Sequence, residues 1–171
     1  NNLEVQVEAS EFLASGQIIL TDLSDEEWLL LESEGLGAYS MPLDENYVDP
    51  DSTEYGLLYN GYALNDARGV CPEGFRIPVH EEWETLIDYV DENANKLKEE
   101  GDEHWNPDNN GTNESGFTAL GSGYRSGSHG AYSSPKQTAR FWTSTLNLDS
   151  SSTNSDWLYA ISMHSGTSLI D

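Results

Sequence analysis

The sequence contains one cysteine, Cys71, in 171 residues. A single thiol excludes chemistry that needs two, such as a pair of redox-active or copper-binding cysteines. Cysteine is among the most buried residue types, and neither a lysine nor a second cysteine adjoins this one in the sequence. We therefore expect Cys71 to be a small buried apolar residue beside Phe75 rather than a reactive thiol.

Basic residues are also scarce, since 7 lysines and arginines stand against 31 acids and give a formal net charge of −24. Nucleic acids and anionic bilayers bind clustered lysine and arginine, so we expect neither as a partner. No apolar run reaches the length of a membrane-spanning helix, so we expect no direct membrane insertion. The acidic excess indicates either bound cations such as calcium or a solvated acidic face, and the composition leaves both open.

The length and composition predict one domain over residues 1–171. A hydrophobic share of 36% and an aromatic share of 11% are typical of a globular domain, not of a disordered acidic tail. The first residues lack the basic and apolar regions of a signal peptide, so we expect the chain to be one module of a larger protein.

Two segments have the features of helices. Ser24 and Glu27 form a capping-box pattern and Gly35 follows as a stop signal, which predicts a short helix over 25–34. A second helix is predicted from 81 to about 98, because apolar residues recur there at helical spacing. These residues are Trp83, Leu86, Ile87, Val90, Ala94 and Leu97.

The remainder is typical of short strands and loops. Residues 1–20 alternate apolar and polar positions, and apolar groups at 117–120, 140–146 and 156–163 are separated by Gly, Ser and Asn. Residues 42–56 carry prolines and acids without periodicity, which predicts an exposed loop. The fold class is therefore α+β, with two helices bracing a small, mostly antiparallel sheet that has long loops.

Four motifs occur in an order that resembles a known family. They read EYGLLYNGYA at 54–63, CPEGFRIPVHEEW at 71–83, SGFTALGSGYR at 115–125 and FWTST at 141–145. This succession is similar to the Fibrobacter succinogenes major paralogous domain, a bacterial surface family, over roughly residues 20–170. The resemblance implies a C-type-lectin-like fold of the kind found in formylglycine-generating enzymes, and an extracellular or cell-surface location. It also implies a second cysteine in a terminal strand, for which this sequence has no counterpart, so Cys71 is left unpaired.

We expect no enzymatic activity. A cysteine–histidine hydrolase would pair Cys71 with one of four scattered histidines, a pattern that often arises by chance. The histidines are His80, His104, His129 and His164. A carboxylate-pair glycosidase needs an acid in an apolar neighbourhood that raises its pKa, and the sequence offers none.

A calcium site is one possibility in the segment that precedes Gly111. Asn106, Asp108 and Asn110 alternate there like the first half of a calcium loop, and Glu114 could complete the oxygen shell. Position twelve of such a loop is Phe117 instead of a bidentate glutamate. An Asx-rich turn without an ion explains the same residues, and both explanations stay open.

The late Gly- and Ser-rich loops, 122–134 and 147–157, are the predicted ligand face, because loops held by a rigid scaffold commonly carry function. Aromatic rings, hydroxyls and arginine forks are side chains that a binding surface uses. The predicted ligand-binding residues are Tyr124, Arg125, Ser126, His129, Tyr132, Arg140, Trp157 and Tyr159. Asp149 and Asp156 are the acids expected to touch calcium or ligand there.

Together these features predict an adhesin-type, ligand-binding module that is monomeric, secreted or cell-surface, and calcium-dependent. Its partner would be a peptide or a glycan on another cell or protein. Carbohydrate is suggested by the lectin-like fold, and a peptide carboxylate by arginine and calcium on an acidic body. Two alternatives stay open, namely a structural spacer that binds nothing and a receptor-binding domain resembling the variable proteins of diversity-generating elements.

Overall fold

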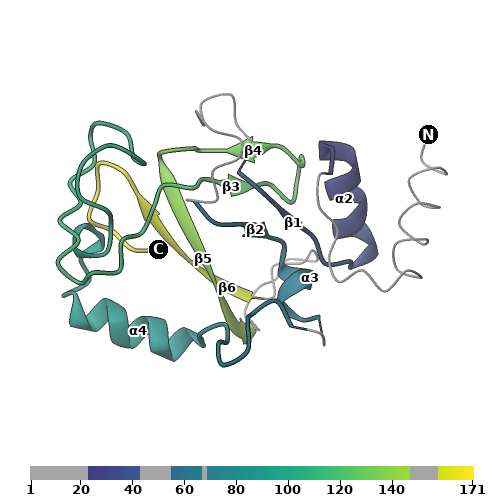
Figure 1. The fold of residues 1–171 in the computed structure, drawn as a ribbon, viewed down its shortest axis with the longest axis horizontal. Helices are drawn as coiled ribbons and strands as arrows, with labels where there is room; N and C mark the ends of the chain where they lie inside the picture. The colour runs from purple at the N-terminus through teal and green to yellow at the C-terminus, as the bar shows by residue number, and fades with distance from the viewer. Residues whose placement is uncertain (1–22, 43–54, 67–68, 147–157) are drawn as a thin grey trace.

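The computed structural model describes residues 23–42, 55–66, 69–146 and 158–171 (Figure 1). Within these ranges the chain has a mixed α+β architecture with short helices and antiparallel strand pairs. In chain order the elements are α2 (Asp25–Glu34), β1 (Tyr39–Ser40), β2 (Leu58–Tyr59), α3 (Gly61–Leu64), α4 (His80–Tyr89), the 3₁₀ turn η1 (Ala94–Lys96), β3 (Tyr124–Arg125), β4 (Tyr132–Ser133), β5 (Thr138–Leu146) and β6 (Leu158–His164).

The strands form pairs in place of one continuous sheet. In the described residues β1 pairs with β2, β3 with β4 and β5 with β6, each time antiparallel. The β5–β6 pair is the longest and crosses the middle of the molecule, with α4 on one side and α2 on the other (Figure 1). The predicted α+β class is thus confirmed, and the predicted strand at 140–146 lies within β5. No strand forms at 117–120 in this described segment, where Ala119 makes only an isolated bridge with Lys98.

Helix α2 has the bounds that its sequence signals predict. The Ser24 hydroxyl accepts a hydrogen bond from the Glu27 amide at 3.2 Å, and the Glu27 carboxylate accepts one from the Ser24 amide at 2.7 Å. Gly35 ends the helix with a φ of 71°, a left-handed conformation that glycine adopts at little cost. Trp28 and Leu31 are buried on its inner face.

The predicted helix over 81–98 is wrong in its second half. Helix α4 ends at Tyr89, and Asp91 and Glu92 then adopt left-handed φ values of 56° and 57°. The 3₁₀ turn Ala94–Lys96 follows after this break. Apolar residues beyond the break return to the core, so helical spacing in the sequence continues although the helix does not.

The main core lies between α4, the turn after it and the β5–β6 pair. Its buried residues are Trp83, Val90, Ala94, Leu97, Trp105, Ala119, Ala139, Ile161 and Met163. A second, smaller cluster of Trp28, Leu31 and Ala38 lies under α2. In the described part of the chain no helix is both long enough and apolar enough to cross a bilayer. The segments predicted as strands over 1–20 and most of the 42–56 loop lie outside the described residues.

Lys98 is a fully buried cation that joins the turn after α4 to the end of β6 and the loop that follows it. Its Nζ donates hydrogen bonds to the carbonyl oxygens of His164 at 2.9 Å and Thr167 at 3.0 Å, and it lies 5.5 Å from the Trp105 ring centroid. Burial lowers the pKa of Lys98, because desolvation disfavours the ammonium form. The two carbonyl hydrogen bonds and the ring face offset that cost.

We predict that Lys98→Met lowers the unfolding free energy by about 2–3 kcal/mol, because two buried carbonyls lose a charged donor. The matched control is Lys96→Met two residues earlier, where the lysine pairs at the surface with Asp91 at 2.7 Å. That control should change stability much less. Urea unfolding at pH 7 measures both variants, and equal losses would contradict the role assigned to Lys98.

Candidate ligand-binding cleft

A cleft of about 860 Å³ lies between α2, β2, β3 and β5. The segment 70–78, the loop after β3 and the start of α3 complete its described walls. The charged side chains among its described lining residues are three arginines, Arg76, Arg125 and Arg140, and one carboxylate, Glu32. Three of the chain's 7 basic residues thus gather at one cleft, although Arg76 has Glu82 beside it and Arg125 has Asp25 at 3.5 Å.

Arg140 projects from β5 and stacks on a neighbouring ring. Its guanidinium carbon lies 3.7 Å from the Tyr124 ring centroid, which is a close cation–π arrangement. Arg140 is exposed and Tyr124 is half-buried. A guanidinium held against a ring face keeps the N–H groups at its edge free for other partners.

Arg125 is the opposite case, because its side chain is only 1% exposed. Its Nε donates to the Gly130 carbonyl at 2.8 Å, and its Nη2 donates to the carbonyls of Leu23 at 2.7 Å and Ser24 at 3.0 Å. Its guanidinium also lies on the ring faces of Trp28, at 4.5 Å, and Tyr132, at 4.9 Å. These contacts give Arg125 and Tyr132 a role in joining α2 to the β3–β4 turn.

Arg76 is held by a carboxylate at the cleft wall. Its guanidinium donates to both carboxylate oxygens of Glu82, at 2.7 Å for the Nη1 contact, while the Val79 amide donates to Glu82 at 3.0 Å. These bonds, first that from Arg76 and then that from Val79, lower the pKa of Glu82 from its usual 4.5 to about 2. Arg76 is thus neutralised by a neighbour on α4.

The loop between β3 and β4 presents small polar groups to the cleft. Ser126 and Ser128 share a hydroxyl hydrogen bond of 3.0 Å, and the Ser128 amide donates to the Ser126 hydroxyl at 3.2 Å. Gly127, Ser128 and His129 are exposed. Gly130 has a φ of 75°, and a Cβ there would collide with the Asp25 carbonyl, so this position requires glycine.

The structure places the eight predicted ligand-binding residues in different surroundings. Tyr124, Arg125, Ser126, His129 and Arg140 line the cleft. Tyr132 covers the Arg125 guanidinium, and Tyr159 stacks on His80 with centroids 4.4 Å apart. Trp157, Asp149 and Asp156 lie outside the described residues. Ligand binding by these residues stays a prediction.

Sequence reasoning did not assign Tyr59, Arg76 and Trp142 to the cleft, although all three line it. Trp142 donates its indole N–H to the Tyr59 carbonyl at 2.9 Å, which joins β5 to β2. The signal was present in the family motifs at 54–63, 71–83 and 141–145, which are far apart in the sequence and meet at this cleft.

The prediction that Cys71 is buried beside Phe75 is wrong. Cys71 is a free, half-buried thiol at the cleft wall, and Phe75 is 76% exposed. The Phe75 amide donates to the Pro72 carbonyl at 3.0 Å, which closes a tight turn. This turn carries Phe75 into solvent, so its ring contributes nothing to the core.

The predicted calcium ligands have ordinary turn contacts. The Asn110 amide donates to the Asp108 carbonyl at 3.1 Å, and the Glu114 carboxylate accepts from the Thr112 hydroxyl at 3.3 Å. The Asp108 carboxylate lies against Gly166 in the loop after β6. These contacts suit the Asx-rich turn that the sequence left open, and calcium binding at Asp108, Asn110 and Glu114 stays a prediction.

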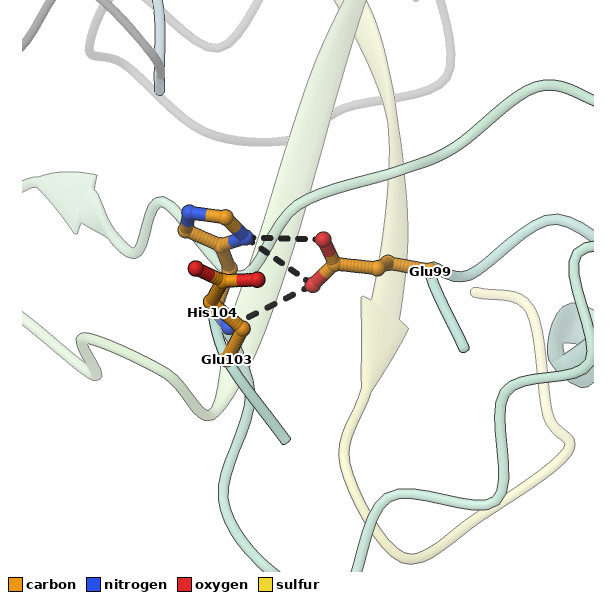
Figure 2. A group of neighbouring side chains, drawn as sticks. All are labelled: Glu99, Glu103 and His104. Carbon is orange, nitrogen blue, oxygen red and sulfur yellow. Dashed lines mark hydrogen bonds and ion pairs between the residues drawn. The ribbon is translucent and has the colours of Figure 1, made fainter. Parts of the chain in front are cut away.

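A different group brings metal-ligating atoms together, as Figure 2 shows. One ligand atom from each of Glu99, Glu103 and His104 lies within 4.8 Å of the other two. The His104 Nδ1 lies 2.8 Å and 3.0 Å from the two Glu99 carboxylate oxygens, and Lys136 donates to the Glu103 carbonyl at 2.7 Å. An imidazole nitrogen with carboxylates suits zinc or another transition metal, whereas calcium prefers oxygen alone. The Glu99–His104 hydrogen bond also accounts for this arrangement without an ion.

We predict that the Arg76–Glu82 pair stabilises the domain above pH 4.5 and loses this effect toward pH 2. The folded pKa of Glu82 is lower than its unfolded value, so its contribution is present above the unfolded pKa and is lost as the pH falls through the folded pKa. The difference in unfolding free energy between the wild type and Arg76→Ala should shrink over this window. In a Glu82→Gln background the Arg76→Ala effect should be independent of pH. Denaturant titrations at several pH values measure this, and a constant difference down to pH 2.5 would be inconsistent with the pairing.

The comparisons with known proteins bear on the whole region just described. The family model of the Fibrobacter succinogenes major domain matches residues 24–166, which include α2, the cleft walls and both long strands. Neither a search of curated proteins nor a search of solved structures found a match. The matched segment covers most of the chain and confirms the resemblance carried by the four motifs. The chain belongs to the Fibrobacter succinogenes major domain family.

Proposed function

We propose that this chain is an extracellular ligand-binding domain of the adhesin type, which holds its ligand in the cleft between α2, β2, β3 and β5. The supporting observation is the composition of the lining, which combines arginines, aromatic rings and hydroxyls in one concave surface. Clefts of roughly 300–1,000 Å³ with a few convergent polar groups are the usual form of ligand sites. The volume of about 860 Å³ falls in this range.

Among the described lining residues, no nucleophile is hydrogen-bonded to a base. Ser126 and Ser128 bond to each other, and the partners found for these hydroxyls include no histidine. Arg125 is occupied by backbone carbonyls and Arg76 by Glu82. We therefore propose binding without catalysis, since no described residue pair in the cleft has the geometry of a nucleophile and its base.

The family resemblance supports the remaining parts of the proposal. A C-type-lectin-like fold presents its ligand site on loops held by a braced core, and the cleft is walled in part by the loop after β3. The same resemblance supports a cell-surface location and the proposal that the domain is one module of a longer protein. Calcium dependence follows from the carboxylate-rich loops of an acidic chain.

The test is a glycan and peptide array probed with the wild type and with a variant whose cleft is filled. Ser128→Trp places a large ring at an exposed lining position, and Thr85→Trp places the same ring on exposed α4 away from the cleft. Ser128→Trp should weaken binding by about tenfold or more, and Thr85→Trp should leave it intact. No binding by the wild type to any array member would instead support the spacer alternative.

For calcium, we predict a higher melting temperature in calcium than in chelator at matched ionic strength. Binding to the native state alone adds RT ln(1 + [L]/Kd), which is about 2.7 kcal/mol at a hundredfold excess over Kd. Asp108→Asn should remove the shift, while Asp102→Asn, also exposed in the same loop, should keep it. Melting curves that coincide with and without calcium would leave only charge screening.

A further inference from the structure

Among the described lysines and arginines, Arg140 differs from the rest in its partners. The other cations donate hydrogen bonds to protein oxygens, either carboxylates or backbone carbonyls. These five are Arg76, Lys96, Lys98, Arg125 and Lys136. The Arg140 side chain has neither a hydrogen bond nor an ion pair within the described ranges, and its contact there is with the Tyr124 ring.

The stacking on Tyr124 positions this cation for an external anion. A guanidinium carries its five N–H groups in one plane, so a ring against its face leaves the edge of the fork open. That edge can bind a carboxylate with two parallel hydrogen bonds. The partner ring is at 3.7 Å from the guanidinium carbon, which limits the rotation of the fork before any ligand arrives.

The walls around Arg140 are not uniformly polar. Leu57, 40% exposed, lines the same cleft together with Leu58, Ile77 and Pro78. Aliphatic side chains bind other aliphatic side chains through burial of apolar surface, and a sugar offers little such surface. A peptide that carries both an apolar side chain and a carboxylate matches both parts of the lining.

We infer that the cleft binds acidic peptides and that Arg140 receives the peptide carboxylate. The inference rests on the proposed function, because it names the ligand class of the same cleft. The Arg140 guanidinium, which has no carboxylate partner among the described residues, then attracts an acidic ligand that the chain as a whole, at −24, repels. The apolar wall formed by Leu57 and Leu58 receives the neighbouring apolar side chain of the peptide.

The experiment uses a library of short peptides that combine leucine or valine with glutamate or aspartate. Each peptide is made in four forms, with acid or amide side chains and with a free or amidated C-terminus. Binding of the whole domain is measured at low and at moderate salt. The side-chain and C-terminal forms separate the two sources of the carboxylate, and a set of uronic-acid oligosaccharides supplies a carboxylate without a peptide.

The variants are Arg140→Gln, Arg140→Lys and the matched control Lys96→Gln, which removes one positive charge away from the cleft. The wild type should bind at least one acidic form about tenfold more tightly than its amide counterpart, and salt should weaken this preference. Arg140→Gln should abolish the preference and Lys96→Gln should retain it. Arg140→Lys keeps the positive charge, so it should retain part of the preference for acidic peptides. This variant keeps the inference testable if Arg140→Gln fails to fold.

Two results would overturn the inference. One is equal binding of acidic and amide peptides, or an acid preference that survives in Arg140→Gln. The other is that the domain binds the oligosaccharides but no acidic peptide, and that Ser128→Trp blocks this binding. This second result would leave the proposed function standing. Absence of all binding would overturn both.

Discussion

The buried guanidinium of Arg125 holds the first helix against the rest of the domain. It donates to the carbonyls of Leu23 and Ser24 just before α2 and to the carbonyl of Gly130 in the β3–β4 turn. Removing such a cation from water is costly unless its N–H groups find acceptors. Nε and Nη2 have them, Nη1 is buried without a hydrogen-bond partner in the described residues, and two ring faces from different elements contribute further. Because these acceptors are backbone groups about 100 residues apart in sequence, the contact sets the position of α2. The α2 wall of the cleft depends on it.

Lys98 repeats this solution at the other end of the molecule. It too is buried, and it too donates its hydrogen bonds to backbone carbonyls, although Arg125 also has the Asp25 carboxylate at 3.5 Å. A buried carboxylate would add a second desolvation cost, whereas a carbonyl is an acceptor that the fold already has to satisfy. The acids are therefore free to stay at the surface, where water and salt screen their repulsion. Arg125 and Lys98 thus stabilise the interior of a protein whose surface is acidic.

The sequence predicted some elements well for local reasons. Helix α2 is defined by Ser24, Glu27 and Gly35, which act within a few residues of one another. The helix predicted beyond Tyr89 was wrong because the left-handed residues Asp91 and Glu92 carry no signal in the sequence, while the core residues after them keep a helical spacing. The 122–134 loop was predicted to carry ligand-binding residues, and it lines part of the cleft. Tyr59 and Trp142 also line the cleft, but the sequence did not assign them to it. Their contact links β2 to β5 and arises from packing across more than eighty residues.

The sequence by itself determined the acidic charge, the α+β class, the capped first helix and the family to which the chain belongs. These properties follow from composition, from local capping and from motifs in order. Only the tertiary structure decided which cations are available to a ligand. Arg76, Arg125 and Arg140 are alike in sequence, yet Arg76 faces Glu82, Arg125 is enclosed by carbonyls and rings, and Arg140 lies open on Tyr124. The physical reason is that the role of a guanidinium depends on which acceptors folding brings close to it. Those acceptors can lie far away in the sequence, so the sequence does not reveal them.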